Sequence, residues 1–291
     1  MYVYSSKYSI SNIYIEVIGK KSVRSSWNLG SCGCKSTARA AVCPRYQGAY
    51  IKVGLKSVTL YMTKMEVTIP ASSLNFLRLL RQNNNREWFN EHKEVFLKEQ
   101  SYIEKFAQAL LNEMNVHDLI ETPSGKKSLH RIYRDTRFSK DKIPYKHNWS
   151  GRFSRATKQL RGGYYFHIEP GNSFVAGGFF APNPADLKLI RDDISFDSAP
   201  LRAIIQDETF KQSFGVLEGE QLKTTPKGFE ANDEAIDLLR FKQFLLIRHF
   251  SDEEVTSSAF VQLVNQTFKN MRPFFDYMSM VLTTNGDGLE I

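Results

Sequence analysis

The fold class of this chain of 291 residues is decided by a stretch that reads Tyr164-Tyr165-Phe166-His167-Ile168-Glu169-Pro170-Gly171-Asn172-Ser173-Phe174-Val175-Ala176. Residues 164–168 and 173–176 are rich in the aromatic and β-branched types that favour strands. Proline, glycine and asparagine between these runs favour a turn. The stretch therefore predicts a β-hairpin. Gly177 and Gly178 follow it and predict a bulge or a close approach of another backbone.

Helices are predicted on both sides of the hairpin from apolar residues that recur at helical spacing. Start signals are Ser72 or Ser73 before the first helix, Asn85 before the second, and Asn183-Pro184 after the hairpin. The first expected helix ends before Gln82, and further helices are expected over residues 86–114, 184–194, 201–206, 208–214, 255–271 and 273–282. Another helix is expected to begin at the cap Asn232. Its buried residues would be Ile236, Leu239, Phe241, Phe244 and Leu245. Helices that flank a small, mostly antiparallel sheet define an α+β protein. The absence of a long linker predicts a single domain over residues 66–285.

The charge of the chain is unevenly distributed. The formal net charge is +8, but residues 1–64 hold ten lysines and arginines against one acid, Glu16, so the remainder has a net charge of −1. All three cysteines, at positions 32, 34 and 43, also lie in this first segment. Their spacing is not that of a zinc knuckle, and the segment contains no histidine. The basic excess therefore belongs to an extension and not to the body of the chain.

Three interpretations of residues 1–64 compete. The segment could be a targeting peptide, a small basic module that binds nucleic acid, or sequence upstream of a misassigned start, with Met62 or Met65 as the true start. No apolar core of a secretory signal follows a basic start. We favour the third interpretation and expect residues 1–64 to be a basic, disordered extension or a misassigned start.

We expect a soluble, cytoplasmic protein. Hydrophobic residues make up 42% and charged residues 24% of the chain, which is typical of a globular domain. The longest apolar runs fall far short of the ~20 residues that a membrane span needs, so no membrane partner is expected. The body lacks cysteine and needs no oxidising compartment.

The stretch from Ser128 to His147 concentrates charge. Its basic residues are Arg131, Arg134, Arg137, Lys140, Lys142 and Lys146, and only Asp135 and Asp141 oppose them. If residues 129–138 form a strand, residues 131, 133, 135 and 137 share one face and residues 132, 134, 136 and 138 share the other. A guanidinium group binds phosphate or carboxylate through two parallel hydrogen bonds. The alternative is a surface ladder of weak ion pairs.

These residues give a candidate site. Arg131, Arg134, Arg137 and Lys142 are the expected ligand-binding residues, together with Lys227 from a basic loop. Asp135, His167 and Tyr145 are the candidate acid–base groups. No metal is expected, because His167 and Glu169 lack a third ligand, and no phosphate-binding P-loop or dinucleotide fingerprint occurs. The sequence leaves the cofactor unknown.

Several separated motifs resemble one family. They are Arg131-x-x-Arg134-Asp135-x-Arg137-Phe138-x-x-Asp141-Lys142-x-x-Tyr145, Asn84-Asn85-Arg86-Glu87-Trp88-Phe89 with His92-Lys93, Tyr164 to Pro170, Gly177-Gly178, Pro182, Leu222-Lys223, and Pro226-Lys227-Gly228-Phe229. Over about residues 70–285 the chain resembles the bacterial and fungal family called domain of unknown function 2461. The resemblance implies a soluble domain of about this length with no established activity.

Three hypotheses about function remain. We prefer a domain that binds a small phosphate- or carboxylate-bearing molecule, and the sequence does not decide whether it is an enzyme. The first alternative is a protein-interaction or scaffold domain with a structural arginine network. The second is nucleic-acid binding, against which the body's net charge of −1 argues. The oligomeric state is left open.

Overall fold

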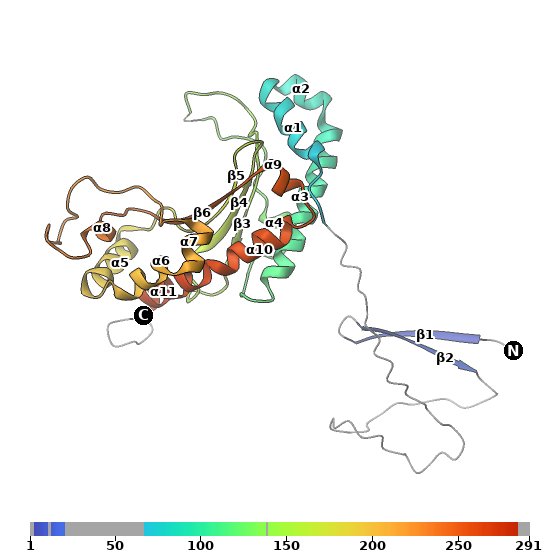
Figure 1. Ribbon diagram of the computed structural model, residues 1–291. Helices are drawn as coiled ribbons and strands as arrows, with labels where there is room; N and C mark the ends of the chain where they lie inside the picture. Colours follow the sequence, from blue (N-terminus) through green and yellow to red (C-terminus); the bar gives the residue numbers. More distant parts are fainter. Residues whose placement is uncertain (1–2, 11–12, 21–66, 138, 285–291) are drawn as a thin grey trace, which may run out of the picture. The chain divides into compact units, whose positions relative to one another are not determined.

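The computed structural model describes residues 3–10, 13–20, 67–137 and 139–284 (Figure 1). The chain divides into two compact units, Met1–Tyr61 and Met62–Ile291. In the first unit β1 (Val3–Ile10) and β2 (Ile13–Lys20) pair in antiparallel fashion. The three cysteines lie outside the described residues. The interpretation of residues 1–64 as an extension or misassigned start therefore stays a prediction.

The second unit contains a four-stranded antiparallel sheet with strand order β3-β4-β5-β6. Its strands are β3 (Trp149–Ser154), β4 (Gly163–Ile168), β5 (Ser173–Phe179) and β6 (Phe244–Phe250). The predicted hairpin is β4–β5, and at its turn the Asn172 amide donates to the carbonyl of Glu169 over 2.9 Å. Gly171 adopts a φ of +73° there, a conformation that suits glycine. The expected α+β class with a mostly antiparallel sheet is confirmed.

Two strands of the second unit were not expected. Phe244 and Leu245 were assigned to a long helix after Asn232, but only the short helix α8 (Ile236–Leu239) forms, and the chain is extended from Phe244. The prediction was wrong because a short apolar run fits a buried helix and a buried strand equally well. β3 was missed altogether, although polar and apolar residues alternate along part of it.

The remaining helices surround the sheet. They are α1 (Ala71–Gln82), α2 (Arg86–Glu91), α3 (Lys93–Met114), α4 (Gly125–Ser128), α5 (Pro184–Phe196), α6 (Ala199–Gln206), α7 (Glu208–Phe214), α9 (Asp252–Thr256), α10 (Phe260–Asn270) and α11 (Arg272–Thr283). The predicted caps Asn85 and Asn183 are confirmed, because each side chain accepts a backbone amide of the first turn. In the described ranges no helix combines the length and apolar character needed to cross a bilayer.

Three predicted boundaries were wrong. The helix expected over residues 86–114 is interrupted at His92 and becomes α2 and α3. The helix expected over residues 255–271 is likewise split into α9 and α10. Neither Ser72 nor Ser73 caps α1, because both hydroxyls donate instead to the buried carboxylate of Glu99. A distant tertiary contact has therefore replaced the local cap.

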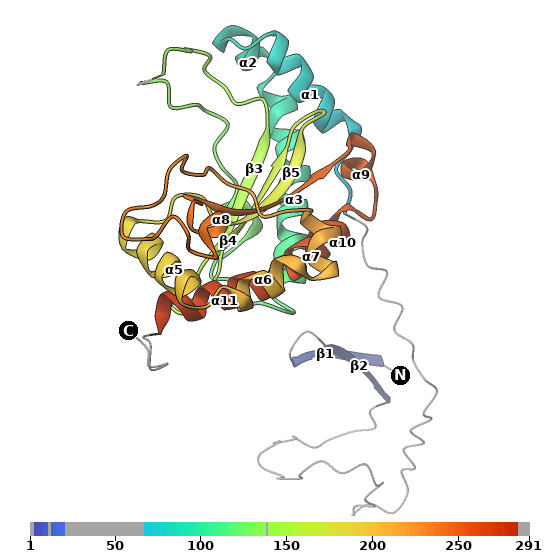
Figure 2. The same ribbon diagram turned by 60° about the vertical axis from the view of Figure 1, so that its left-hand side comes forward.

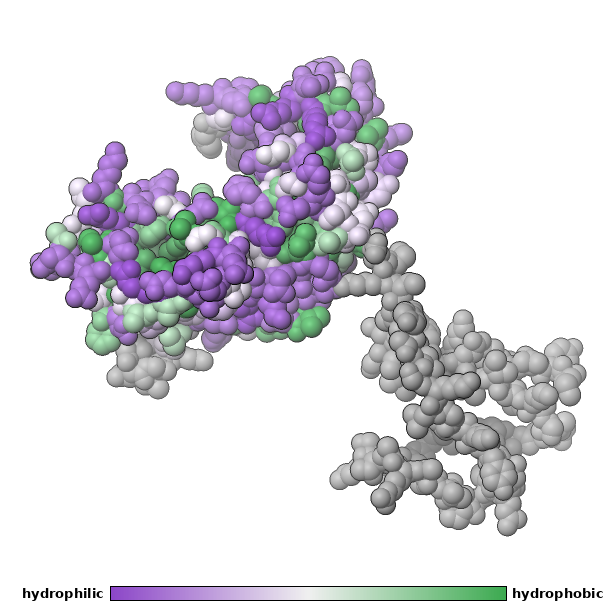
Figure 3. Space-filling view, viewed as in Figure 1, coloured by the Kyte–Doolittle hydropathy of each residue, from purple (hydrophilic) through white to green (hydrophobic). Residues whose placement is uncertain are grey.

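The two faces of the sheet differ in burial. Along β4 and β5 every second residue is buried. Helix α3 contacts β3 and helix α10 contacts β5 (Figure 2). Gly177 and Gly178 confirm the expected close approach: a Cβ at Gly177 would lie 2.4 Å from Met271 Sδ, and one at Gly178 would lie 2.1 Å from the carbonyl oxygen of Phe244. The residues of the opposite face are mostly half-buried. The described surface seen in Figure 3 is mainly hydrophilic, with hydrophobic residues scattered over it.

The half-buried face carries two rows of side chains that cross all four strands. Because directly paired residues of antiparallel strands project to the same side, the register defines each row. What we call the ring row consists of Ser150, His167, Phe174 and His249. The neighbouring row consists of Arg152, Tyr165, Ala176 and Ile247.

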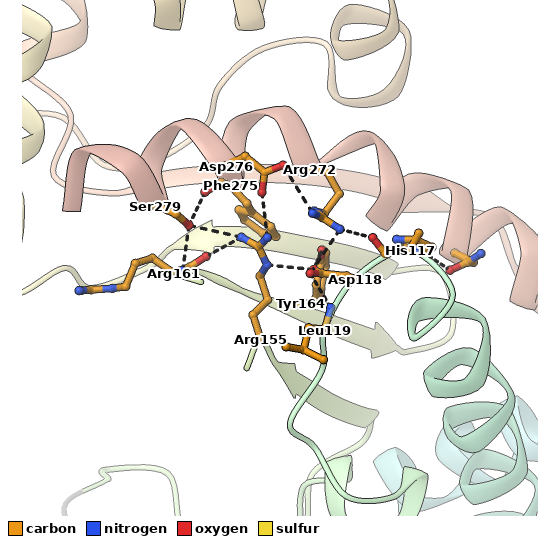
Figure 4. Close-up of polar contacts among 11 residues, drawn as sticks. His117, Asp118, Leu119, Arg155, Arg161, Tyr164, Arg272, Phe275, Asp276 and Ser279 are labelled. Carbon is orange, nitrogen blue, oxygen red and sulfur yellow. Dashed lines mark hydrogen bonds and ion pairs between the residues drawn. The ribbon is translucent and has the colours of Figure 1, made fainter. Parts of the chain in front are cut away.

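A buried polar network joins the segment after α3, the β3–β4 connection and α11 (Figure 4). Arg155 Nε donates to Asp118 Oδ2 over 2.9 Å, and its other nitrogens bond to Asp276, Ser279 and the carbonyl of Arg161. The Tyr164 hydroxyl donates to the same Asp118 oxygen over 2.6 Å. The donors of Arg155 are satisfied by the protein itself, so this network serves the fold.

Candidate functional site

The predicted arginine stretch lies on a loop and not on a strand. Over residues 129–138 only the isolated bridges Leu129↔Gly151 and Tyr133↔Tyr145 form. Backbone hydrogen bonds from Arg134 to Pro144 and from Lys146 to Ile132 hold the base of the loop. The expected alternation of two faces was therefore wrong, because too few backbone bonds are made to keep the segment extended as a ladder.

Three cations of this loop, Arg134, Arg137 and Lys142, are bonded to the loop itself. Arg137 donates to both oxygens of Asp135, at 3.0 and 2.7 Å, and its side chain is 77% exposed. Arg134 pairs with Asp141 over 2.7 Å. Lys142 Nζ donates to the carbonyl of Thr136 over 2.8 Å. These contacts are ion pairs and hydrogen bonds at the surface, as the alternative of a surface ladder of weak ion pairs describes. A ligand role for these residues stays a prediction.

The three acid–base candidates have different surroundings. Asp135 faces solvent in its ion pair with Arg137, which lowers the pKa of the carboxyl. Tyr145 is buried and stacks on Phe89 with ring centroids 4.0 Å apart, and burial raises the pKa of its phenol. His167 lies on β4. No hydrogen bond or ring contact joins these three among the residues described. Lys227 is exposed and makes no hydrogen bond or ion pair in that part of the chain.

An open cleft lies beside the edge strand β3. The segment from Ile120 to Leu129 runs along this strand, joined to it by the bridges Ile120↔Arg155 and Leu129↔Gly151. The cleft has a volume of about 440 Å³. Its lining residues are Glu121, Thr122, Pro123, Lys127, Ser128, Leu129, His130, Arg152 and Ser154. Three of these side chains, Lys127, His130 and Arg152, are basic, and one, Glu121, is acidic.

The cations of the cleft differ from those of the arginine loop. In the described part of the chain Lys127 and Arg152 make no side-chain hydrogen bond or ion pair, and the same holds for the nearby Arg131 and Lys146. By contrast Lys126, the neighbour of Lys127, pairs with Glu104 over 3.5 Å. Unpaired positive charges that share a cleft are an unfavourable arrangement that a bound anion relieves.

The electrostatics of the cleft show this crowding of positive charge. Loss of solvent lowers the pKa of His130, and the charges of Lys146 and Arg152 lower it further. Burial likewise lowers the pKa of Lys146, with a contribution from Arg131. His130 Nδ1 lies 3.3 Å from Ser150 Oγ. The ring is therefore mainly neutral at neutral pH and is able to gain a proton when a negative charge arrives.

A hydrogen-bonded chain adjoins the cleft. The Tyr165 hydroxyl lies 3.1 Å from His167 Nδ1, and His167 Nε2 lies 3.0 Å from Glu169 Oε2. The other oxygen of Glu169 is 3.0 Å from His147 Nε2. Burial raises the pKa of the Tyr165 phenol, so it stays protonated and donates. Burial alone would raise the pKa of Glu169, but the hydrogen bonds from His167 and Asn172 and the charges of both histidines outweigh it and lower that pKa.

Both ring nitrogens of His167 are thus occupied. Nδ1 faces the Tyr165 hydroxyl and Nε2 faces the Glu169 carboxylate. The Tyr165 ring connects this chain to the cleft, because its centroid lies 6.0 Å from that of the His130 ring. No group of three or more His, Cys, Asp or Glu side chains within the described ranges is arranged to hold a metal ion.

Sequence reasoning missed Lys127, His130 and Arg152. Lys127 belongs to the stretch Ser124-Gly125-Lys126-Lys127-Ser128, which was rejected because it does not make a P-loop. Arg152 lies on the unexpected strand β3. Its signal was the alternation of Gly151 and Phe153 with the polar residues Ser150, Arg152 and Ser154, which is typical of a strand with one polar face.

The fold and the cleft together define a mixed α+β protein with a basic cleft at one edge of the four-stranded antiparallel sheet. The chain matches the family described as conserved hypothetical protein (DUF2461) over residues 72–277. It therefore belongs to this family, as its motifs led us to expect. No curated protein and no solved structure gave a significant match.

Proposed function

We propose that this protein binds a small anionic molecule, bearing phosphate or carboxylate, in the cleft lined by Lys127, His130 and Arg152. One observation supports the proposal above the others. The cations at the cleft lack partners within the described residues, whereas Arg134 and Arg137 of the loop are paired with carboxylates. An unpaired cation beside an open volume has a charge and a geometry that suit an anion.

The proposal keeps part of the sequence-based site. Arg131 stands next to Lys146, whose charge acts on His130 in the cleft. The centre of the proposed site nevertheless moves from the loop arginines to β3 and the segment before it. Arg134, Arg137 and Lys142 are assigned to holding the loop together through their own contacts.

Two adjacent lysines provide a matched test. Isothermal titration calorimetry with inorganic phosphate, pyrophosphate and citrate measures binding directly. Lys127→Ala removes an unpaired cleft cation, whereas Lys126→Ala removes a cation paired with Glu104. Loss of a charged hydrogen bond costs about 1.5–3 kcal/mol, so we expect roughly 10- to 100-fold weaker binding for Lys127→Ala. Lys126→Ala is expected to bind as the unmodified protein does.

A second pair repeats the comparison with arginine. Arg152→Ala is expected to weaken binding of the same anions, and Arg137→Ala is not, because Arg137 is occupied by Asp135. Equal losses in Arg152→Ala and Arg137→Ala would contradict the choice of cleft. The absence of binding to any of the anions would favour the scaffold alternative.

A further inference from the structure

The ring row lies directly beside the anion cleft. The His130 ring, which lines the cleft, is 6.0 Å from the Tyr165 ring, and the Tyr165 ring is 5.9 Å from the Phe174 ring. His167 stacks on Phe174 with centroids 4.7 Å apart and an interplanar angle of 13°. The basic cleft and the aromatic face of the sheet are therefore continuous.

The aromatic side chains on this face are not part of the main core. The buried face of the same strands supplies Tyr164, Phe166 and Val175 to the core. Tyr165, His167 and Phe174 project to the opposite side and are half-buried, and His249 at the end of the row is exposed. Partly exposed aromatic rings on a four-stranded antiparallel sheet provide a surface against which a flat ring of a ligand can pack.

We infer that the ligand of the proposed anion site, on which this inference rests, is a mononucleotide. Its phosphate binds Arg152, Lys127 and His130, and its base packs against the outward-facing parts of the Tyr165, Phe174 and His249 rings. Charge complementarity determines the orientation. The unpaired cations Lys127 and Arg152 lie at the β3 edge, where the phosphate is placed, and the rings lie further across the sheet. A phosphate without an aromatic group would leave the adjoining rings unused.

A mononucleotide fits the structure better than a nucleic-acid chain. The body after residue 64 has a net charge of −1, whereas proteins that bind along a phosphate backbone normally present an extended basic surface. The unpaired cations Lys127 and Arg152 line one cleft, and the charges of Lys146 and Arg152 act on its His130. One phosphate group and one base match one cleft and one group of rings.

The test compares adenosine monophosphate, ribose 5-phosphate, inorganic phosphate and adenosine by isothermal titration calorimetry on the full chain. Base stacking on an aromatic side chain contributes enough to change affinity by roughly 5- to 100-fold. We expect adenosine monophosphate to bind tighter than ribose 5-phosphate by a factor in this range. Phe174→Leu is expected to remove this preference and to leave the affinity for ribose 5-phosphate unchanged, whereas Arg152→Ala weakens both phosphates.

A second variant keeps the test valid if Phe174→Leu does not fold. His249→Ala changes an exposed residue on the edge strand β6 and is expected to weaken the nucleotide alone. Equal affinities for adenosine monophosphate and ribose 5-phosphate would overturn the nucleotide assignment and leave the anion site standing. If adenosine binds and no phosphate compound binds more tightly than adenosine, the anion site itself fails. Much tighter, steeply salt-dependent binding of a single-stranded oligonucleotide would replace the mononucleotide by nucleic acid.

Discussion

Arg155 Nε donates a hydrogen bond of 2.9 Å to Asp118 Oδ2, and the two side chains are 0% and 1% exposed. Asp118 also accepts from the hydroxyl of Tyr164 and pairs with Arg272 over 3.3 Å. The buried carboxylate therefore connects a segment after α3, strand β4 and helix α11 (Figure 4). Arg152 differs from Arg155, because its side chain makes no hydrogen bond or ion pair within the described residues. This difference is the basis for proposing Arg152, and not Arg155, as a ligand-binding residue.

Replacing Arg155 by methionine is expected to destabilise the protein strongly. The change leaves Asp118 buried with only part of its compensating charge, and removing one partner of a buried ion pair costs about 3–5 kcal/mol. Urea denaturation followed by circular dichroism gives the free energy of unfolding. Arg137→Ala, at an exposed pair, is the control and is expected to leave stability nearly unchanged. Similar effects of the two substitutions would contradict a structural role for the buried network.

Gly178→Ala is expected to destabilise the protein more than Gly171→Ala. Both glycines have positive φ, +125° and +73°, so alanine is strained at each. Only at Gly178 would the new Cβ meet the Phe244 carbonyl, at 2.1 Å, whereas nothing lies within 4 Å of it at Gly171. Strain alone costs about 1–2 kcal/mol, and the clash adds to it at Gly178. The measurement is the free energy of unfolding of both variants under the same conditions. Equal values would contradict a close approach of β5 and β6 at Gly178.

The hairpin was predictable because its signal is local. Strand-forming residues on both sides of Pro170-Gly171-Asn172 specify both strands and the turn without reference to the rest of the chain. Asn85 and Asn183 were predictable for the same reason, since a cap bonds to its own first helical turn. Ser73 shows the limit of this reasoning, because its hydroxyl bonds to Glu99, 26 positions away. A contact over that separation cannot be read from neighbouring residues.

The candidate site was harder to predict for a related reason. The arginine loop attracted attention through the number of its charges, but whether a charge is available depends on its partners in space. Arg137 and Arg152 are the same residue type, yet only one has a carboxylate within hydrogen-bond distance among the contacts described. The cleft forms between β3 and a segment more than twenty positions earlier. The strand β3 had to be recognised before Lys127 and Arg152 could be placed together.

Tyr164 is expected to make the protein sensitive to alkaline pH. Burial, followed by the hydrogen bond to Asp118, raises the pKa of the phenol above its ordinary value of 10.0. In the unfolded chain the group ionises near that value, whereas in the folded protein it stays protonated. The stabilising contribution is therefore complete below pH 10.0 and is lost as the pH rises from there toward the folded-state pKa.

The measurement is the midpoint of urea unfolding as the pH is raised through this window. Tyr164→Phe is expected to be less stable at neutral pH, because Asp118 loses a donor, but to show a shallower decline above pH 10.0. Tyr277, which is bonded to Asp193 and has a raised pKa for the same reasons, supplies the part of the decline that remains. Parallel declines for the unmodified protein and Tyr164→Phe would refute this assignment.

Anion binding in the cleft is expected to strengthen as the pH falls, through His130. In the free protein loss of solvent, Lys146 and Arg152 lower the pKa of this ring from its ordinary value of 6.5. A bound anion favours the protonated ring and so raises that pKa, which couples binding to proton uptake. The gain in affinity is complete below the free-state pKa of His130 and is lost as the pH rises through its bound-state pKa. It amounts to roughly tenfold for each pH unit between the two pKa values.

Sulfate is the suitable probe because its own charge stays constant over this range. His130→Gln is expected to abolish the pH dependence of the sulfate affinity, and His147→Gln, which changes a ring bonded to Glu169, to preserve it. A dependence that survives in His130→Gln and disappears in His147→Gln would transfer the role to the hydrogen-bonded chain of His147, Glu169 and His167.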